Sequence, residues 1–177
     1  RKHMAEVDGE EPLGGEGKIV EVDETFVGGK TKGMDWRKRK TVVMGMIERD
    51  GDAHLEVVAD QTSSSLIPEI HAHVKAGTEI HTDELRTYDK FMGSKTKYTH
   101  KTVNHSKGEY ATPDGVSTNQ IESFFNHLKK SIAGTHTSVS RKHLERYVKE
   151  FEYRFNRRTN PEVMLGELLS RFPELEA

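Results

Sequence analysis

Residues 117–132 constrain the fold more than any other stretch, because they predict one long amphipathic helix. Apolar side chains recur there at the i, i+3, i+4, i+7 spacing that gathers them along one side of a helix. They are Ile121, Phe124, Phe125, Leu128 and Ile132. Polar side chains fall on an adjacent flank, within about a quarter turn of one another. They are Asn119, Glu122, Asn126 and Lys129. The pattern predicts a helix buried along one stripe that carries a carboxylate and a lysine on another.

The sequence allows two roles for the Glu122 side chain, as a metal ligand or as part of a helix cap. A carboxylate at Glu122 and an ammonium group at Lys129, two turns apart on one flank, suit a metal ion beside a phosphate. Asn119 and Glu122 also have the N-cap and N3 spacing of a capping box, in which both side chains bond backbone N–H groups. The helix alone leaves both interpretations open, and Asn119 is the alternative metal ligand.

The composition favours one folded domain. The chain has 177 residues, of which 33% are hydrophobic and 32% are charged, and periodic apolar segments recur along it. No apolar run approaches the ~20 residues that a membrane span needs, and the start has no apolar signal region. With no cysteine, a zinc site would need histidine and carboxylate ligands. We therefore expect no membrane partner. Residues 1–4 look like a cloning remnant.

The net charge of −2 argues against a nucleic-acid partner, but the distribution of charge along the chain favours one. Residues 5–24 are strongly acidic, whereas basic side chains concentrate in residues 30–40 and in the last third of the chain. Local basic surface is what binds a phosphate backbone. The candidate DNA-binding residues are Lys30, Lys32, Arg37, Lys38, Arg39, Lys40, Lys129, Lys130, Arg141, Lys142, Arg146, Arg154, Arg157 and Arg158. A solvated face with no nucleic-acid partner is the alternative interpretation of each cluster.

The order of predicted elements indicates an α/β fold with a mixed five-stranded sheet flanked by helices. Strands are expected at residues 18–23, 41–47, 54–59, 79–83 and 98–103. Helices are expected at residues 63–76, 84–92, 117–132, 140–158 and 160–169. We divide the chain into a flexible lead-in at 1–17, a main domain at 18–158 and a helical C-terminal extension at 159–177.

Three acids stand at positions where a metal site could form. Asp23 and Asp83 each end a predicted strand, and Glu122 lies on the later helix. Ligand sites gather where neighbouring strands end, and clustered carboxylates need a cation to offset their repulsion. Mg²⁺ prefers such oxygens, and two ions about 4 Å apart can promote in-line phosphoryl displacement. Each Asp taken singly could equally be a turn former at a strand end.

Five segments appear together in one order. They are residues 13–29 with Val22-Asp23-Glu24, residues 80–88 with Thr82-Asp83-Glu84, Val103-Asn104-His105-Ser106, residues 118–130 with Asn119-Gln120-Ile121-Glu122, and residues 134–158. This set resembles the catalytic domain of DDE transposases of the Merlin type and their bacterial insertion-sequence relatives, the ISXO2-like transposases. The resemblance covers roughly residues 12–158.

The resemblance implies a ribonuclease H-like fold in which Asp23, Asp83 and Glu122 bind two Mg²⁺ or Mn²⁺ ions. Lys129 matches a lysine that follows the third acid in the family, and His105 matches a neighbour of the active site. The implied partners are transposon ends and target DNA, bound by a homodimer or a larger assembly. The implied location is the cytoplasm or nucleoid of a bacterium, or the nucleus of a eukaryote. Family members usually add an N-terminal zinc ribbon or helix-turn-helix, so this cysteine-free chain resembles a catalytic core.

The function expected from the sequence is metal-dependent DNA cleavage at transposon ends followed by strand transfer into target DNA. One alternative keeps the fold but makes the protein a structure-selective nuclease of the Holliday-junction or ribonuclease H kind. Another makes it a domesticated, non-catalytic DNA-binding protein in which the acids serve as caps and turns.

Overall fold

The computed structural model describes residue 4 and residues 11–28, 40–88, 97–104, 111–135 and 139–170. Its strands are β1 (Ile19–Val27), β2 (Thr41–Glu48), β3 (Ala53–Val58), β4 (Glu79–Thr82) and β5 (Thr99–Thr102). Its helices are α2 (Ser63–His73), α3 (Asn119–Thr135), α4 (Arg141–Asn156) and α5 (Val163–Leu169). The predicted α/β class is confirmed, and the mixed five-stranded sheet flanked by helices is consistent with a ribonuclease H-like fold.

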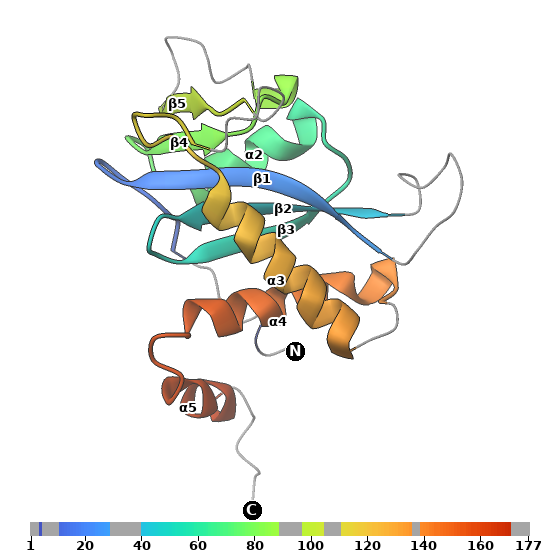
Figure 1. Cartoon of the computed structure of the whole chain (residues 1–177). Coiled ribbons are helices and arrows are strands. Elements are labelled where there is room, and N and C mark those ends of the chain that lie inside the picture. Colours follow the sequence, from blue (N-terminus) through green and yellow to red (C-terminus); the bar gives the residue numbers. More distant parts are fainter. Residues whose placement is uncertain are drawn as a thin grey trace, which may run out of the picture.

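The five strands form one sheet in the order β3-β2-β1-β4-β5 (Figure 1). Strands β1, β2 and β3 form an antiparallel meander, whereas β4 and β5 join β1 in parallel. β1 is therefore the central strand, with an antiparallel neighbour on one side and a parallel neighbour on the other. Ligand sites form readily where a neighbouring strand of such a sheet ends.

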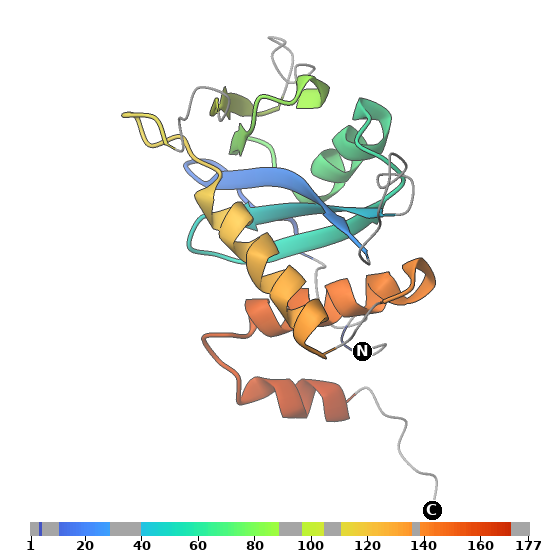
Figure 2. The same ribbon diagram turned by 45° about the vertical axis from the view of Figure 1, so that its right-hand side comes forward.

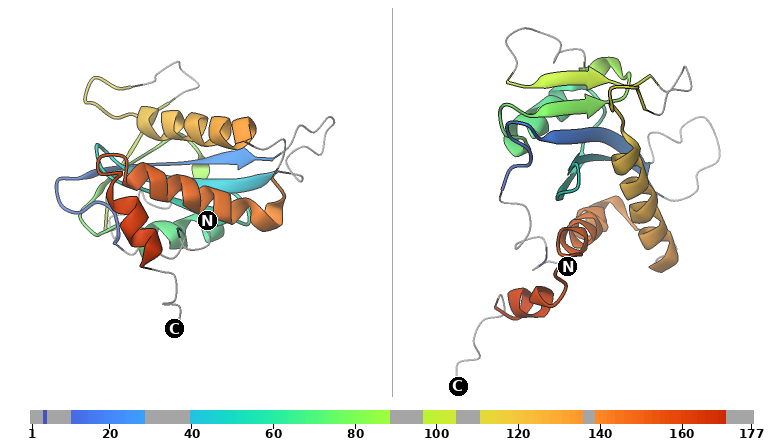
Figure 3. Two further views of the ribbon diagram at one scale, coloured as in Figure 1. Left: turned by 90° about the horizontal axis from the view of Figure 1, so that it is seen from below. Right: turned by 60° about the vertical axis from the view of Figure 1, so that its left-hand side comes forward.

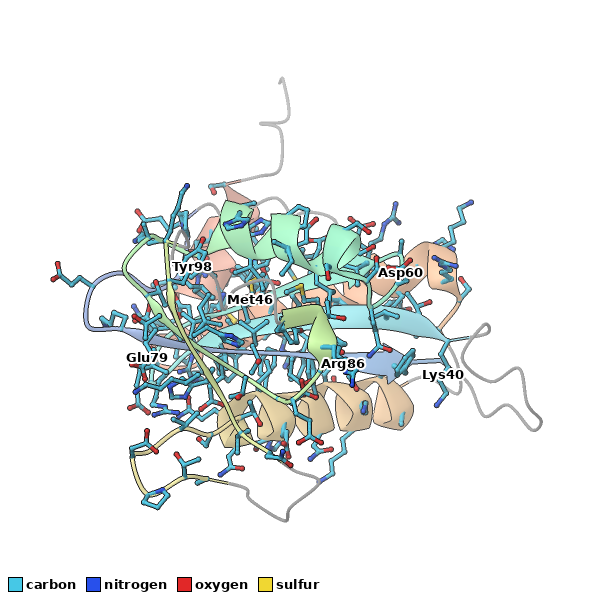
Figure 4. The ribbon with its side chains drawn as sticks, turned by 90° about the horizontal axis from the view of Figure 1, so that it is seen from above. Lys40, Met46, Asp60, Glu79, Arg86 and Tyr98 are labelled. Atoms are coloured by element: carbon cyan, nitrogen blue, oxygen red, sulfur yellow. The ribbon has the colours of Figure 1, made fainter. Side chains whose placement is uncertain are left out.

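Helices cover both faces of the sheet. Viewed from above, the sheet lies between α2 and α3, with the labelled side chains of Met46 and Tyr98 on the α2 side (Figure 4). The α2 side has a core of buried apolar residues that includes Val20, Val22, Met44, Met46, Leu66, Ile70 and Ile80. The α3 side has a separate core that includes Val43, Ile47, Leu55, Ile121, Phe124, Phe125, Leu128, Leu144 and Val148. Side chains of this kind contribute about 1.5–3 kcal/mol each when buried.

The predicted apolar stripe of α3 is confirmed. Ile121, Phe124, Phe125 and Leu128 are at most 3% exposed, and Ile132 is half-buried. Helix α3 therefore lies against β1 and β2 along the stripe that the sequence predicts, and it crosses in front of the strands in Figure 1.

Helix α4 protects the outer edge of β3. The Asn156 amide accepts a bond from the backbone N–H of Ala53 at 2.8 Å and donates one to its carbonyl at 2.9 Å. Glu152, which is fully buried, accepts a bond from the backbone N–H of Leu55 at 2.5 Å. Exposed strand edges invite pairing with other chains, and these two side chains occupy that edge instead.

Helix α5 lies on the far side of α4 from the sheet (Figures 2 and 3). The Tyr153 hydroxyl donates to the Glu167 carboxylate at 2.9 Å, and the Arg157 guanidinium pairs with the same carboxylate at 3.0 Å. Within the described residues, no helix is both long and apolar enough to cross a membrane.

Several predicted boundaries are wrong, and the first helix, for example, ends at His73 and not at residue 76. β1 does not end at Asp23 but continues to Val27, because its second half keeps pairing with β2. In the predicted helix at 84–92, the described part holds a single 3₁₀ turn at residues 86–88. The last helix begins at Val163, because Pro161 and Glu162 form a turn before it.

Part of the expected lead-in packs on the domain. Leu13 is 7% exposed, and its backbone exchanges 2.8 Å bonds with His73 and Lys75 at the end of α2. Residues 11–17 therefore adjoin the sheet, and the division of the chain at residues 17 and 158 stays a prediction.

Candidate active site

The acids of β1 are divided between the two faces of the sheet. Successive side chains of a strand point to opposite faces. Glu24 lies on the α2 side, where its carboxylate accepts bonds from the Tyr88 hydroxyl at 2.6 Å and the Gln61 amide at 2.7 Å. Glu21 and Asp23 therefore point to the α3 side. The central strand thus presents two carboxylates to the helix that carries Glu122.

Asp83 follows β4 at the point where that strand stops pairing with β1. The parallel register joins Ile19 to Glu79 and Glu21 to His81. Continued by two residues beyond the last pair, the same register would place Asp83 beside Asp23 and on the same face, and the charge of Asp83 acts on Asp23. The Asp83 carboxylate also accepts a bond from the backbone N–H of Leu85 at 3.0 Å. The sequence therefore placed Asp83 correctly at a strand end, whereas Asp23 lies inside a strand whose parallel neighbour has ended.

A glycine lets α3 lie close to Asp23. Gly45 is the partner of Asp23 on β2, and it faces α3. A Cβ at Gly45 would stand 2.8 Å from the side chains of Ile121 and Phe125. An added side chain at Gly45 would therefore force the side chains of Ile121 and Phe125, or the helix that carries them, to move. Glu122 follows Ile121 directly, so this close contact also sets the height of Glu122 above β1.

The charges of Asp83 and Glu122 both affect the pKa of Asp23. Burial raises the pKa of Asp23 from an ordinary 3.8 to about 8, with further upward contributions from the charges of Glu24, Asp83 and Glu122. The backbone N–H of Glu24 donates a 2.8 Å bond to the Asp23 carboxylate, which lowers the pKa in part. Burial and neighbouring acids both disfavour a charged carboxylate. Asp23 is thus a half-buried acid that lies among other acids.

The N-terminus of α3 is capped by Glu21 and not by the predicted capping box. The Glu21 carboxylate accepts bonds from the backbone N–H groups of Gln120 at 2.9 Å and Ile121 at 3.1 Å. The Glu122 carboxylate accepts a 3.2 Å bond from the Thr118 hydroxyl, and Asn119 is the exposed first residue of the helix. The capping-box interpretation of Asn119 and Glu122 is therefore wrong, because a residue 99 positions away satisfies the helix end.

Glu21 belongs to a buried polar network that sequence reasoning missed. Its carboxylate is 0% exposed and pairs with the Arg49 guanidinium at 2.9 Å. That guanidinium also lies 3.3 Å from the His81 ring and from the Ser117 hydroxyl. His81 in turn contacts the Glu79 carboxylate at 2.7 Å. A signal was available in the sequence, since strand alternation puts Glu21 on the same face as Asp23.

Lys129 lies in the same electrostatic field as Asp23. Burial and the nearby charge of Lys40 lower the pKa of Lys129, and the charge of Asp23 acts in the opposite direction. Lys40 stands at the start of β2, at the end of the sheet (Figure 4). Two lysines thus accompany the acids on the α3 side.

The other predicted basic residues divide into three groups. Lys130, Arg141, Lys142 and Arg146 are exposed on α3 and the first turns of α4. Three arginines have partners within the fold. Arg154 lies 3.8 Å from Glu150, Arg157 pairs with Glu167, and Arg158 packs on the Phe155 ring and donates to the Gly51 carbonyl. Lys30, Lys32, Arg37, Lys38, Arg39 and His105 lie outside the described residues.

The donor set suits Mg²⁺ or Mn²⁺, whose usual protein ligands are carboxylate oxygens. Among the described residues, however, no three histidine, aspartate or glutamate side chains are grouped closely enough to hold a metal ion. The chemistry of Asp23, Asp83 and Glu122 therefore fits the ion, while their approach to a common centre stays a prediction.

A cavity of about 820 Å³ lies elsewhere, between α3 and α4. It is lined by Ser123, His127 and Ser131, on the flank of α3 away from Glu122. Phe151 and Arg154 line its α4 side. The cavity is therefore separate from the three acids.

These features agree with what comparison to known proteins shows, which places the chain among transposases. The chain belongs to the ISXO2-like transposase family, whose domain model matches residues 12–156. It is 33% identical over 100 residues to an uncharacterized transposase-like protein of Haemophilus influenzae, a match that covers 56% of this chain and 77% of that protein. No solved structure matches the chain. The sequence resemblance to ISXO2-like transposases is thus confirmed, and it implies DNA as the partner.

Proposed function

We propose that the chain is the catalytic domain of a metal-dependent transposase that cleaves DNA at transposon ends and transfers the strand to target DNA. The position of Asp23 carries this proposal. It is a half-buried carboxylate of the central strand whose pKa is raised to about 8 by desolvation and by the surrounding acids Glu24, Asp83 and Glu122. A fold gains little from such a cluster unless a cation joins it.

Asp23, Asp83 and Glu122 would supply the anionic oxygens that hold two Mg²⁺ or Mn²⁺ ions. When bound, these ions supply the positive charge that favours the attacking and leaving oxygens of a phosphodiester displacement. Lys129 would bind a phosphate oxygen beside the acids, because its charge lies in the field of Asp23. His105 stays a predicted neighbour of the site.

The proposed reaction has two displacements at phosphorus. In the first, a water oxygen forms a P–O bond at the transposon end while the bond to the 3′ oxygen breaks, leaving a 3′-hydroxyl. In the second, that hydroxyl oxygen forms a new P–O bond to a phosphorus of target DNA, while the bond from this phosphorus to the target's own 3′ oxygen breaks and leaves a 3′-hydroxyl on the target strand. The exposed Lys130, Arg141, Lys142 and Arg146 would hold phosphates without reading sequence. Assembly as a homodimer or larger on DNA is part of the proposal.

The test is an assay that separates cleavage from strand transfer. Labelled duplexes carrying the ends of the protein's own element are incubated with supercoiled plasmid in Mg²⁺ or Mn²⁺. We expect both cleaved ends and joined products, and loss of both in Asp23→Asn, Asp83→Asn and Glu122→Gln variants that stay folded by circular dichroism. Cleavage without joining would favour the structure-selective nuclease. DNA binding without cleavage or joining, whether or not divalent ions are present, would favour the non-catalytic protein.

A further inference from the structure

The N-terminal turn of α3 is joined to the sheet through one buried carboxylate. Glu21 is 0% exposed, and one of its oxygens accepts the backbone N–H groups of Gln120 and Ile121. Its other oxygen accepts a 2.9 Å bond from Arg49, which lies in the turn between β2 and β3. Bonds that involve a charged group are the stronger ones, and a carboxylate at a helix N-terminus also interacts favourably with the helix dipole.

The contact between Glu21 and α3 lies next to two proposed metal ligands, Asp23 on the strand and Glu122 on the helix. Glu21 and Asp23 share a face of β1 and are two residues apart, which is about 7 Å along a strand. Ile121, whose N–H Glu21 accepts, directly precedes Glu122. The strand that presents Asp23 therefore also holds the helical turn that presents Glu122.

The side chains beside the joint restrict α3 further. The Ser117 hydroxyl, just before the helix, lies 3.4 Å from the Glu21 carboxylate and 3.3 Å from Arg49. On the next turn, Ile121 and Phe125 rest against Gly45 with no room for an added Cβ. Helix α3 is thus held by hydrogen bonds at its N-terminus and by packing against Gly45 one turn later. Its residues cannot shift along β1 without breaking these contacts.

We infer that Glu21, together with Arg49, is a positioning residue of the active site that fixes where Glu122 lies relative to Asp23. The inference rests on the proposed function, in which these two acids share metal ions. Mutating a group that orients a metal ligand typically changes metal affinity or activity about 10–100-fold. Glu21 acts through the backbone of Ile121, which directly precedes Glu122. A residue that merely stabilises the fold would lower stability and leave metal affinity unchanged.

The chain offers a matched control in Glu152. It is also 0% exposed, and it also accepts a backbone N–H, that of Leu55. It lies on α4 at the outer edge of β3, away from the three acids. Glu21→Gln and Glu152→Gln thus remove the same charge from two equally buried carboxylates, and only the first should affect the metal site.

The experiment measures Mn²⁺ affinity of the full chain by calorimetry and by the paramagnetic signal of free Mn²⁺, beside urea unfolding. We expect both variants to unfold at lower urea, Glu21→Gln to bind Mn²⁺ at least tenfold more weakly, and Glu152→Gln to bind within about twofold of the wild type. Arg49→Lys keeps a cation but not the guanidinium geometry. We expect Arg49→Lys to weaken Mn²⁺ binding by a smaller factor than Glu21→Gln does. It replaces Glu21→Gln as the test if that variant does not fold.

The outcomes separate this inference from the proposed function. If Glu122→Gln weakens Mn²⁺ binding but Glu21→Gln and Arg49→Lys bind like the wild type, the positioning role is overturned and the metal site stands. If Glu152→Gln weakens Mn²⁺ binding as much as Glu21→Gln, the effect is general loss of stability and the positioning role is again overturned. If Glu122→Gln binds Mn²⁺ like the wild type, the proposed site itself is wrong.

Discussion

Asp23 and Glu24 are neighbours on one strand, yet the two faces of the sheet give their carboxylates opposite surroundings. On the α2 side, Glu24 accepts bonds from the Tyr88 hydroxyl and the Gln61 amide. On the α3 side, Asp23 accepts the backbone N–H of Glu24 and lies in the field of Asp83 and Glu122. Burial is the main cause that raises the pKa of both acids. The charge of Asp83 also acts on both acids, so the difference between them is that two side-chain donors bind Glu24.

The difference separates a structural acid from a candidate ligand. Buried polar groups are normally satisfied by donors within the protein, as Glu24 is. The surroundings of Asp23 instead favour its neutral, protonated form unless a cation from solution offsets the charge. Glu21 gives a second example of the structural kind, since Arg49 and two backbone N–H groups complete its surroundings. Charge balance therefore separates the roles of three acids within four residues of sequence.

The largest expected effect comes from exchanging each acid for its amide. Asp23→Asn should lower strand-transfer activity by about a hundredfold or more, because a neutral amide holds a divalent ion poorly. Its stability should stay equal or rise, since repulsion from Asp83 and Glu122 is relieved. Glu24→Gln should lose less than about tenfold in activity, but about 1 kcal/mol in stability, because one amide oxygen cannot accept both donors.

Activity assays and urea unfolding on the same two preparations check this prediction. Equal losses of activity in the two variants would show that the two faces of β1 do not differ in function and that Glu24 also serves the metal site. Full activity in Asp23→Asn would remove Asp23 from the site altogether.

The same contrast shows how far the sequence alone could reach. Periodicity predicted the α3 stripe, the positions of the strands along the chain and the side of α3 that carries Glu122 and Lys129, because these depend on neighbours within a few residues. It also placed Asp83 at the end of a strand. It did not predict that Glu21 caps α3, because that contact joins residues 99 positions apart. It ended β1 too early, because pairing with β2 decides where that strand stops.

A smaller effect is expected from a change that lifts α3 away from Asp23. Gly45→Ala should lower stability by about 1–3 kcal/mol, because its Cβ would overlap Ile121 and Phe125. It should also lower activity while leaving Glu24 and its donors unchanged. Gly134→Ala is the matched control, since Gly134 lies on α3 with nothing within 4 Å of an added Cβ.

The control should stabilise the protein by roughly 0.5–1 kcal/mol, because alanine favours a helix more than glycine does. Urea unfolding measures both changes. A Gly45→Ala variant with wild-type stability and activity would mean that close seating of α3 is not required.

The pH dependence of the metal-free protein should be smaller but specific to the α3 side. The pKa of Asp23 is raised from 3.8 to about 8, so the folded state holds a proton that the unfolded state releases. Its contribution to stability is present below pH 4 and is lost as pH rises through 8. The melting temperature should therefore fall by several degrees between pH 5 and pH 8 without divalent ions.

Two comparisons attribute this fall to Asp23. Asp23→Asn should flatten the pH profile of the melting temperature. Adding Mg²⁺ at about 10 mM, a roughly saturating concentration, should also flatten it if the ion replaces the proton on Asp23. A profile that is equally steep in Asp23→Asn would assign the proton to another group, such as Glu24, whose pKa is also raised.

The smallest expected effect tests whether DNA approaches the face that carries Asp23. Each lysine that contacts a phosphate contributes about one unit to the slope of log affinity against log salt concentration. Lys129→Gln should therefore reduce this slope by about one and weaken binding equally for different DNA sequences. Lys18→Gln is the matched control, because the Lys18 ammonium group already pairs with Glu48 at 2.9 Å, just before β1. Fluorescence anisotropy with a labelled duplex between 50 and 300 mM salt (a range of roughly sixfold) resolves a change of this size. If the Lys18 variant changes the slope and the Lys129 variant does not, DNA lies against a different surface. The contrast between the two faces of β1 would then concern metal binding alone.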